Sequence, residues 1–153
     1  MLEAFTPSRP RALLTSPRDN ILGILPTCGF MTLDISSGLD VTIIGQSGQT
    51  GSRGDGIRRE WLDLVAAQFM DANVNLFRSR DGGRTFDPSP TAATTVDNHL
   101  AQLRCVGKVV GVALLHGECM CHTRFSEPLL RQLLRCAAPI CSQACSAVAN
   151  WSL

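Results

Sequence analysis

The segment from Ile57 to Phe69 constrains the fold of this chain most strongly, because its apolar residues recur with the period of an α-helix. They stand at positions i, i+4, i+7, i+8 and i+12, a spacing that gathers them into one stripe. A stripe with large aromatic side chains needs an apolar surface to cover it. We therefore predict a core around this helix, with Asp55 as its N-cap. The stripe consists of Ile57, Trp61, Leu64, Val65 and Phe69.

Strand-like segments stand on both sides of this helix. Residues 39–44 alternate and then run apolar, which predicts a strand, and a glycine-rich loop over residues 45–56 follows them. Beyond the helix, residues 76–80 and 84–86 flank the turn sequence Asp81-Gly-Gly and predict a hairpin. Residues 1–20 are rich in proline, arginine and serine, which indicates a loose lead-in.

Two further helices are predicted in the second half of the chain. One spans residues 127–135, with Ser126 as its cap. The other spans residues 97–116 and contains Gly107 and Gly111 on one face. Because glycine costs a helix roughly 1 kcal/mol relative to alanine, we interpret this pair as packing residues that let another backbone approach. The expected core positions of the longer helix are Leu100, Leu103, Val106, Val110 and Leu114.

The order of strand, helix, hairpin, helix and helix predicts a mostly helical α+β fold. The chain has 153 residues, of which 44% are hydrophobic, so it can bury the core of one domain. Its net charge of +1 argues against nucleic acid as a partner, and its longest apolar run, residues 109–115, is too short to span a membrane. The N-terminus lacks a secretory signal, so we expect the seven cysteines to be reduced thiols.

Six motifs in the chain resemble, in order and spacing, the opening segment of a HECT-type ubiquitin ligase domain. The sequence GDGIRREWLDL is similar to the family's glycine turn and R-E-W-F-x-x-L helix, and DGGRTFDP resembles its D-G-x-T-F-x-P-N hairpin. The sequence GKVVGVAL matches a G-x-x-x-G-x-A-L helix. The hairpin motif is nearest to the HECT ligases with ankyrin repeats, although the chain has no such repeats. The motifs lie at residues 41–48, 54–64, 75–77, 81–88, 99–114 and 125–134.

This resemblance implies a division of the chain into three parts. Residues 38–134 correspond to the start of the HECT large lobe, residues 1–37 form a lead-in, and residues 135–153 form an unrelated, cysteine-rich tail. Gln46 replaces an acidic residue of the family pattern, and the glycine loop is about four residues longer than usual. The similarity stops before the part that carries the catalytic cysteine, so we expect a truncated chain without its catalytic lobe.

The family activity is the transfer of ubiquitin from a conjugating enzyme, through a cysteine thioester, to a substrate lysine. The resemblance therefore implies ubiquitin and a ubiquitin-conjugating enzyme as partners of the full-length protein, in the cytoplasm or nucleus, and no nucleic acid or membrane. We assign no catalytic, cofactor-binding or metal-binding residue and expect no cofactor. Thr27-Cys28 copies the family's T-C dipeptide but precedes the first strand of the domain, which argues against a nucleophile.

Three other readings of the sequence remain. The chain could be a non-catalytic interaction module or short isoform that associates with other ligase segments through exposed apolar faces. His116, Cys119, Cys121 and His122 are potential metal ligands, although the Cys-x-Cys spacing is tight for zinc. The glycine loop follows a strand and precedes a helix as a phosphate loop does, but it contains no lysine and neither glycine fingerprint, so a structural turn is favoured. We interpret Arg58, Arg59 and Glu60 as a polar network with this turn.

Overall fold

The computed structural model describes residues 10–44, 54–120 and 123–136. Its elements are β1 (Ala12–Pro17), α1 (Ile21–Ile24), a 3₁₀ turn η1 (Phe30–Thr32), β2 (Leu39–Ile44), α2 (Asp55–Met70), β3 (Phe77–Ser79), β4 (Phe86–Pro88), α3 (Ala92–Thr95), α4 (His99–His116) and α5 (Glu127–Cys136). The predicted α+β class, mostly helical with a few short strands, is confirmed. None of the described helices is both long enough and apolar enough to cross a membrane.

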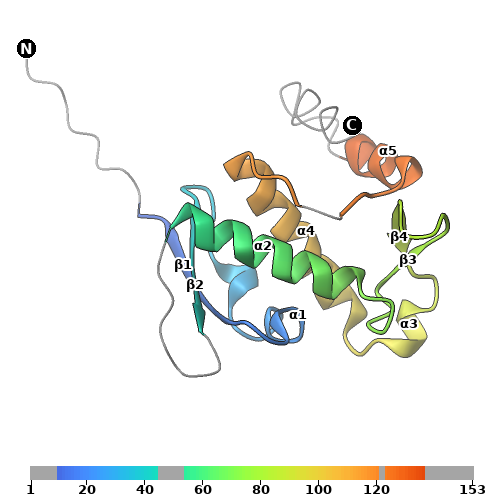
Figure 1. The fold of residues 1–153 in the computed structure, drawn as a ribbon, viewed down its shortest axis with the longest axis horizontal. Coiled ribbons are helices and arrows are strands. Elements are labelled where there is room, and N and C mark those ends of the chain that lie inside the picture. The colour runs from blue at the N-terminus through green and yellow to red at the C-terminus, as the bar shows by residue number, and fades with distance from the viewer. Residues whose placement is uncertain (1–9, 45–53, 121–122, 137–153) are drawn as a thin grey trace, which may run out of the picture.

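Two small sheets lie at opposite ends of the described region, with α2 and α4 running between them (Figure 1). β1 and β2 pair in parallel, with Ala12 opposite Leu39, and β3 and β4 form the predicted antiparallel hairpin. The prediction of a loose lead-in is wrong for residues 12–17, because they form β1. Leu14, Ile21 and Phe30, which all lie within the predicted lead-in of residues 1–37, are buried in the core.

Helix α2 is the centre of the core, as its apolar stripe predicts. Trp61, Val65 and Phe69 are fully buried, and the ring of Trp61 meets Phe30 edge-to-face at a centroid distance of 5.9 Å. Asp55 is the first residue of the helix and Gly54 precedes it as the N-cap, so the predicted cap is displaced by one residue. Gly54 has φ of 145°, a backbone conformation that glycine adopts most readily.

The face that helix α4 turns to the core overlaps the predicted face only in part. Its buried residues are Cys105, Val106, Val109, Val112 and Ala113. Of the predicted core positions Val106 is buried, and Leu103 and Val110 are half-buried and pack against the core, whereas Leu100 is 60% exposed and Leu114 is 40% exposed. The helix therefore has two apolar faces, and periodicity alone could not decide which of them the core covers.

Helix α5 begins as its sequence predicts. The amide of Leu129 donates to the hydroxyl of Ser126 at 3.3 Å, and the amide of Leu130 donates to the Ser126 carbonyl at 3.0 Å. This pattern is that of an N-cap serine. The hydroxyl of Ser126 also bonds Asp87 on β4, and the amide of Ser126 donates to the Phe86 carbonyl at 3.0 Å. The start of α5 is thereby fixed to the hairpin.

Candidate functional site

A buried ion pair joins the start of α2 to the end of α4. Arg58 is 4% exposed and Glu118 is 5% exposed. The guanidinium donates to Glu118 Oε1 from Nε at 3.0 Å and from a terminal nitrogen at 2.6 Å, and it donates to the Leu39 carbonyl at 3.4 Å. Asp55 lies 3.0 Å from the same guanidinium. A buried charge with this many partners holds three elements in one arrangement, which is a structural role.

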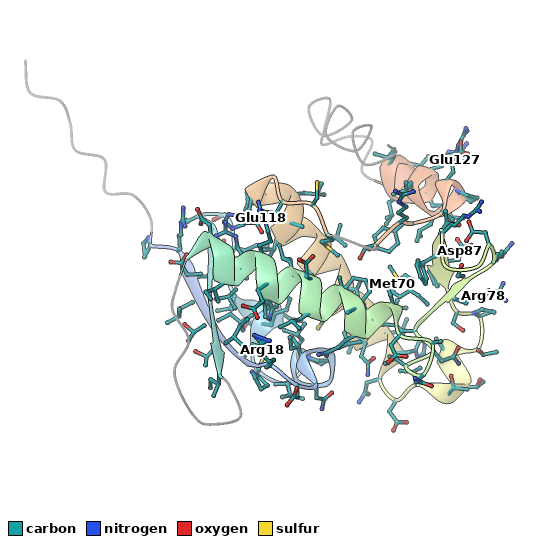
Figure 2. All side chains as sticks on the ribbon, in the orientation of Figure 1. Arg18, Met70, Arg78, Asp87, Glu118 and Glu127 are labelled. Atoms are coloured by element: carbon teal, nitrogen blue, oxygen red, sulfur yellow. The ribbon has the colours of Figure 1, made fainter. Side chains whose placement is uncertain are left out.

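His116, at the end of α4, makes a second polar contact with β2 at this junction. Figure 2 labels Glu118, which follows it in the chain. Its Nε2 accepts a hydrogen bond from the Leu39 amide at 3.0 Å, so this nitrogen carries no proton. Burial lowers the pKa of His116, and the positive charge of Arg58 lowers it further. Gly38, at φ of 103°, lies so close that an added Cβ would sit 3.0 Å from the imidazole. The predicted polar network around Arg58 thus exists and includes Asp55 from the predicted glycine-rich loop, and its other partners are Leu39 on β2 and Glu118 just beyond α4.

Arg59 and Glu60, the other two residues of the predicted network, do not share one environment. Glu60 forms an ion pair with Arg18 beyond the end of β1, and Arg59 is exposed. The glycine-rich loop that they were expected to contact lies, over residues 45–53, outside the described part of the chain, as does Gln46. The pairing with Arg18 could not be foreseen, because the two residues are 42 positions apart.

The D-G-G-R-T-F motif builds a turn. The carboxylate of Asp81 accepts hydrogen bonds from the amides of Arg84 at 3.0 Å and Thr85 at 2.8 Å, and from the hydroxyls of Thr85 and Ser79. These bonds, the Thr85 amide first, lower the pKa of Asp81 to about 2. A carboxylate with four hydrogen bonds from its own turn stabilises the hairpin.

Cys28 and Cys105, two of the cysteines in the described region, show no sign of an activated nucleophile. Cys105 is buried, and burial, with a smaller contribution from nearby Cys28, raises the pKa of its thiol. Cys28 is exposed, and its sulfur lies 3.6 Å from the Leu25 carbonyl within a local turn. A transfer cysteine requires a stabilised thiolate. Neither thiol has a hydrogen bond to a histidine or another base.

Metal binding finds little support in the described residues, which contain no group of three His, Cys, Asp or Glu side chains that could hold an ion. Of the four potential ligands, His116 has its Nε2 occupied by the Leu39 amide, and Cys119 is a free thiol. Cys121 and His122 lie outside the described residues.

Lys108, the single lysine of the chain, is fastened to the turn η1. Its ammonium donates to the carbonyls of Phe30 at 2.7 Å, Leu33 at 2.6 Å and Met31 at 3.1 Å, and it lies 5.2 Å from the centre of the Phe30 ring. Burial lowers the pKa of this lysine. An amine used in this way caps the 3₁₀ turn and is poorly placed to accept a modifying group.

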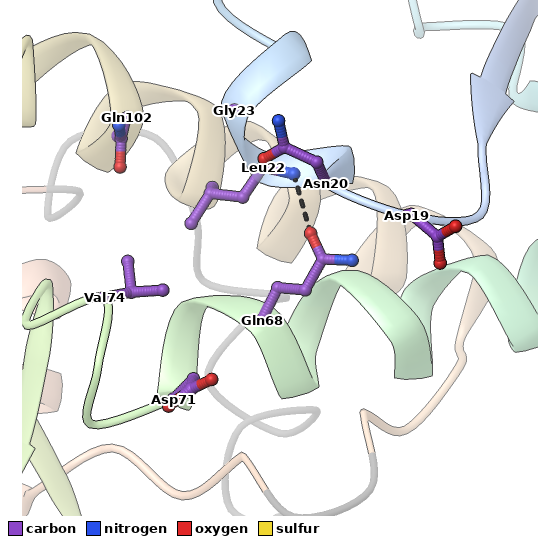
Figure 3. A pocket seen from close by; sticks show the side chains of 8 residues that line it. All are labelled: Asp19, Asn20, Leu22, Gly23, Gln68, Asp71, Val74 and Gln102. Carbon is purple, nitrogen blue, oxygen red and sulfur yellow. Dashed lines mark hydrogen bonds between the residues drawn. The ribbon is translucent and has the colours of Figure 1, made fainter.

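A polar pocket lies between α1, α2 and α4 (Figure 3). It is about 320 Å³ in volume, and Asp19, Asn20, Gln68, Asp71 and Gln102 contribute polar side chains to its lining. Figure 3 shows Gln68 reaching from α2 to α1, where its Oε1 accepts the Leu22 amide at 3.0 Å. That bond ties α1 to the core, which the sequence pattern did not reveal. The pocket holds no pair of groups arranged for acid–base or nucleophilic chemistry.

An apolar groove lies between α4 on one side and the hairpin and α5 on the other. It has a volume of about 460 Å³, and every side chain that lines it is apolar. The α4 wall contains Leu103, Val106, Val110 and Leu114, four of the five residues predicted as core. Gly107 and Gly111 also line the groove, and a Cβ added at either would meet no described atom within 4 Å. The interpretation of these glycines as packing residues is therefore wrong within the described region.

Over part of its length the chain is similar to ubiquitin-protein ligases. The chain is 34% identical over 88 residues to the E3 ubiquitin-protein ligase Smurf1 of Drosophila melanogaster, a match that covers 57% of this chain and 8% of the relative. It is 30% identical over 84 residues to the E3 ubiquitin-protein ligase HACE1 of Xenopus tropicalis and of Homo sapiens, covering 55% of this chain and 9% of each relative. No protein-family model matches the chain.

These matches confirm the resemblance to HECT-type ubiquitin ligases. The expectation of the ankyrin-repeat subgroup fits in part, since HACE1 proteins stand beside Smurf1 among the relatives. The match covers less than a tenth of the length of these relatives. The similarity therefore concerns one segment of a much longer type of protein.

Proposed function

We propose that residues 38–134, with the strand and helix before them, form the opening part of the large lobe of a HECT-type ubiquitin ligase and act as its scaffold. The observation that carries the proposal is the use made of the family motifs. Arg58 of the helix motif is buried in an ion pair, and Asp81 of the hairpin motif closes a turn. Both residues stabilise the fold through contacts within the segment.

The activity of the longer protein would be ubiquitin transfer. A cysteine elsewhere in the ligase takes ubiquitin from a conjugating enzyme as a thioester and passes it to a substrate lysine, a case of nucleophilic catalysis. Ubiquitin and a ubiquitin-conjugating enzyme are then its partners, in the cytoplasm or nucleus. The names of the relatives, all ubiquitin-protein ligases, support this assignment. We expect that the chain by itself does not transfer ubiquitin, because Cys28 and Cys105 lack activation.

An exchange of segments tests the scaffold role. The matching segment of the Drosophila ligase is replaced by residues 10–136 of this chain, so that β1 is carried over with its partner β2. We expect the exchanged ligase to retain self-ubiquitination. A well-folded exchanged ligase that forms the cysteine thioester but has lost transfer would contradict a purely structural role. An exchanged ligase that forms no thioester would show that this chain cannot replace the matching segment of the Drosophila ligase.

A second function, that of a non-catalytic interaction module, is favoured by the apolar groove. An unfilled apolar surface of this kind promotes association with another protein. Increasing amounts of the chain are added to an active Drosophila ligase reaction. Inhibition that grows with concentration would support the module, whereas an unchanged rate supports the scaffold.

A further inference from the structure

The apolar groove has fixed walls, so its opening is a property of the fold. The hairpin and the start of α5 are joined by the bond from the Phe86 amide to the Arg124 carbonyl, 2.8 Å, and by the bonds of Ser126 to β4. The rings of Phe77 and Phe125 meet across this junction at a centroid distance of 5.7 Å, with their planes tilted by 45°. α5 therefore keeps its place opposite α4 and does not close the groove.

The surface inside the groove is one that folding would normally cover. Leu114 is 40% exposed and Leu133, on the α5 side, is 52% exposed. Covering apolar area gains roughly 25 cal/mol per Å². Gly107 and Gly111 leave open space between these side chains, and each glycine costs the helix about 1 kcal/mol relative to alanine. The arrangement fits a bulky apolar side chain laid across α4.

The segment that follows α5 has the composition to cover this surface. Residues 137–153 contain no charged side chain and include Ile140, Val148, Trp151 and Leu153. The chain enters this segment next to the groove, three residues after Leu133. Extended at ~3.3 Å per residue, the stretch from Cys136 to Trp151 reaches on the order of 50 Å, more than the groove requires.

We propose that the end of this segment docks in the groove, with the ring of Trp151 over Gly107 and Gly111. A tryptophan ring buries about 150–250 Å² of surface and carries one polar N–H, which would face water at the rim. Attachment to the same chain favours this occupant, because a tether raises its effective concentration at the groove above that of a separate molecule. The proposal goes beyond the scaffold function and does not depend on it.

Tryptophan fluorescence tests the docking in the full chain. The chain has two tryptophans, Trp61 and Trp151, so the difference between the unmodified chain and Trp151→Phe isolates the emission of Trp151. We expect blue-shifted emission from Trp151 and a quenching constant with acrylamide that is several-fold below that of free indole. Emission and quenching equal to those of free indole would overturn the proposal. Protection that disappears on dilution would also overturn it, because it would indicate a second copy as the occupant.

Filling the groove provides the specific test. Gly111→Leu adds a side chain where no described atom lies within 4 Å, and it replaces a poor helix former, so the fold should tolerate it. We expect this change to shift Trp151 emission to the red and to raise its quenching several-fold. Gly56→Leu, at an open glycine of α2 outside the groove, is the matched control and should change neither. Unchanged protection in a folded Gly111→Leu chain would show that Trp151 docks elsewhere and would refute the proposal.

Discussion

Replacing Glu118 with leucine removes the carboxylate that neutralises the buried guanidinium of Arg58. Both side chains are almost fully buried, and their closest atoms are 2.6 Å apart. Removal of one partner from a buried pair costs ~3–5 kcal/mol, because the other charge remains buried. Asp55 stays within 3.0 Å of Arg58 and offsets part of this cost. We therefore expect Glu118→Leu to lower the free energy of unfolding by about 3 kcal/mol.

The double variant Arg58→Met with Glu118→Leu separates the charge effect from the loss of packing. With both charges gone, the largest remaining cost is the lost hydrogen bond from Arg58 to the Leu39 carbonyl, about 1 kcal/mol. The double variant should therefore be more stable than Glu118→Leu alone by about 2 kcal/mol.

Urea unfolding followed by far-ultraviolet circular dichroism measures these changes. Glu127→Gln is the control, because its pair with Arg131 is exposed on α5 and should change stability by less than ~0.5 kcal/mol. The reasoning is refuted if Glu118→Leu costs less than about 1 kcal/mol, or if the double variant is the less stable of the two.

Three further outcomes follow from the same structure. Gly107→Ala and Gly111→Ala should each raise the free energy of unfolding by about 1 kcal/mol, because the added methyl group meets open space. Lower stability of either variant in thermal unfolding would indicate that another part of the chain packs against that glycine. The pKa of His116 is lower in the folded state than its usual 6.5, so the unfolded state binds more protons below that pH. The free energy of unfolding should therefore fall as the pH drops below about 6.5. This pH dependence should weaken in His116→Gln. Asp81→Ala should speed amide hydrogen exchange in the hairpin turn, measured by NMR, and unchanged exchange at Thr85 would argue against the turn bonds.

Helix α2 could be predicted because its sequence has a single apolar stripe. Trp61 and Phe69 leave no alternative face for the core, so the period of the pattern fixes the buried side. α4 has apolar residues on two faces, and the choice between them depends on which elements pack nearby. Leu103 and Leu114 of the predicted face line the groove, and Leu103 also packs against the core.

The features missed from the sequence depend on contacts between distant residues. β1 lies in a proline- and arginine-rich stretch, and it becomes a strand because β2 pairs with it in parallel. Arg58 and Glu118 are 60 residues apart, and Lys108 and Phe30 are 78 apart. No local spacing rule links such pairs, whereas Ser126 caps the helix directly after it and was predictable from its neighbours.

The central claim is that this chain supplies scaffold and not the transfer step of a HECT-type ligase. The most direct measurement incubates the chain with activating enzyme, conjugating enzyme and ubiquitin and resolves the products without reductant. The full-length Drosophila ligase serves as the positive control. We expect a reductant-sensitive ubiquitin adduct on the control and none on this chain. An adduct on this chain that disappears when one cysteine, such as Cys28, is replaced by serine would contradict the claim.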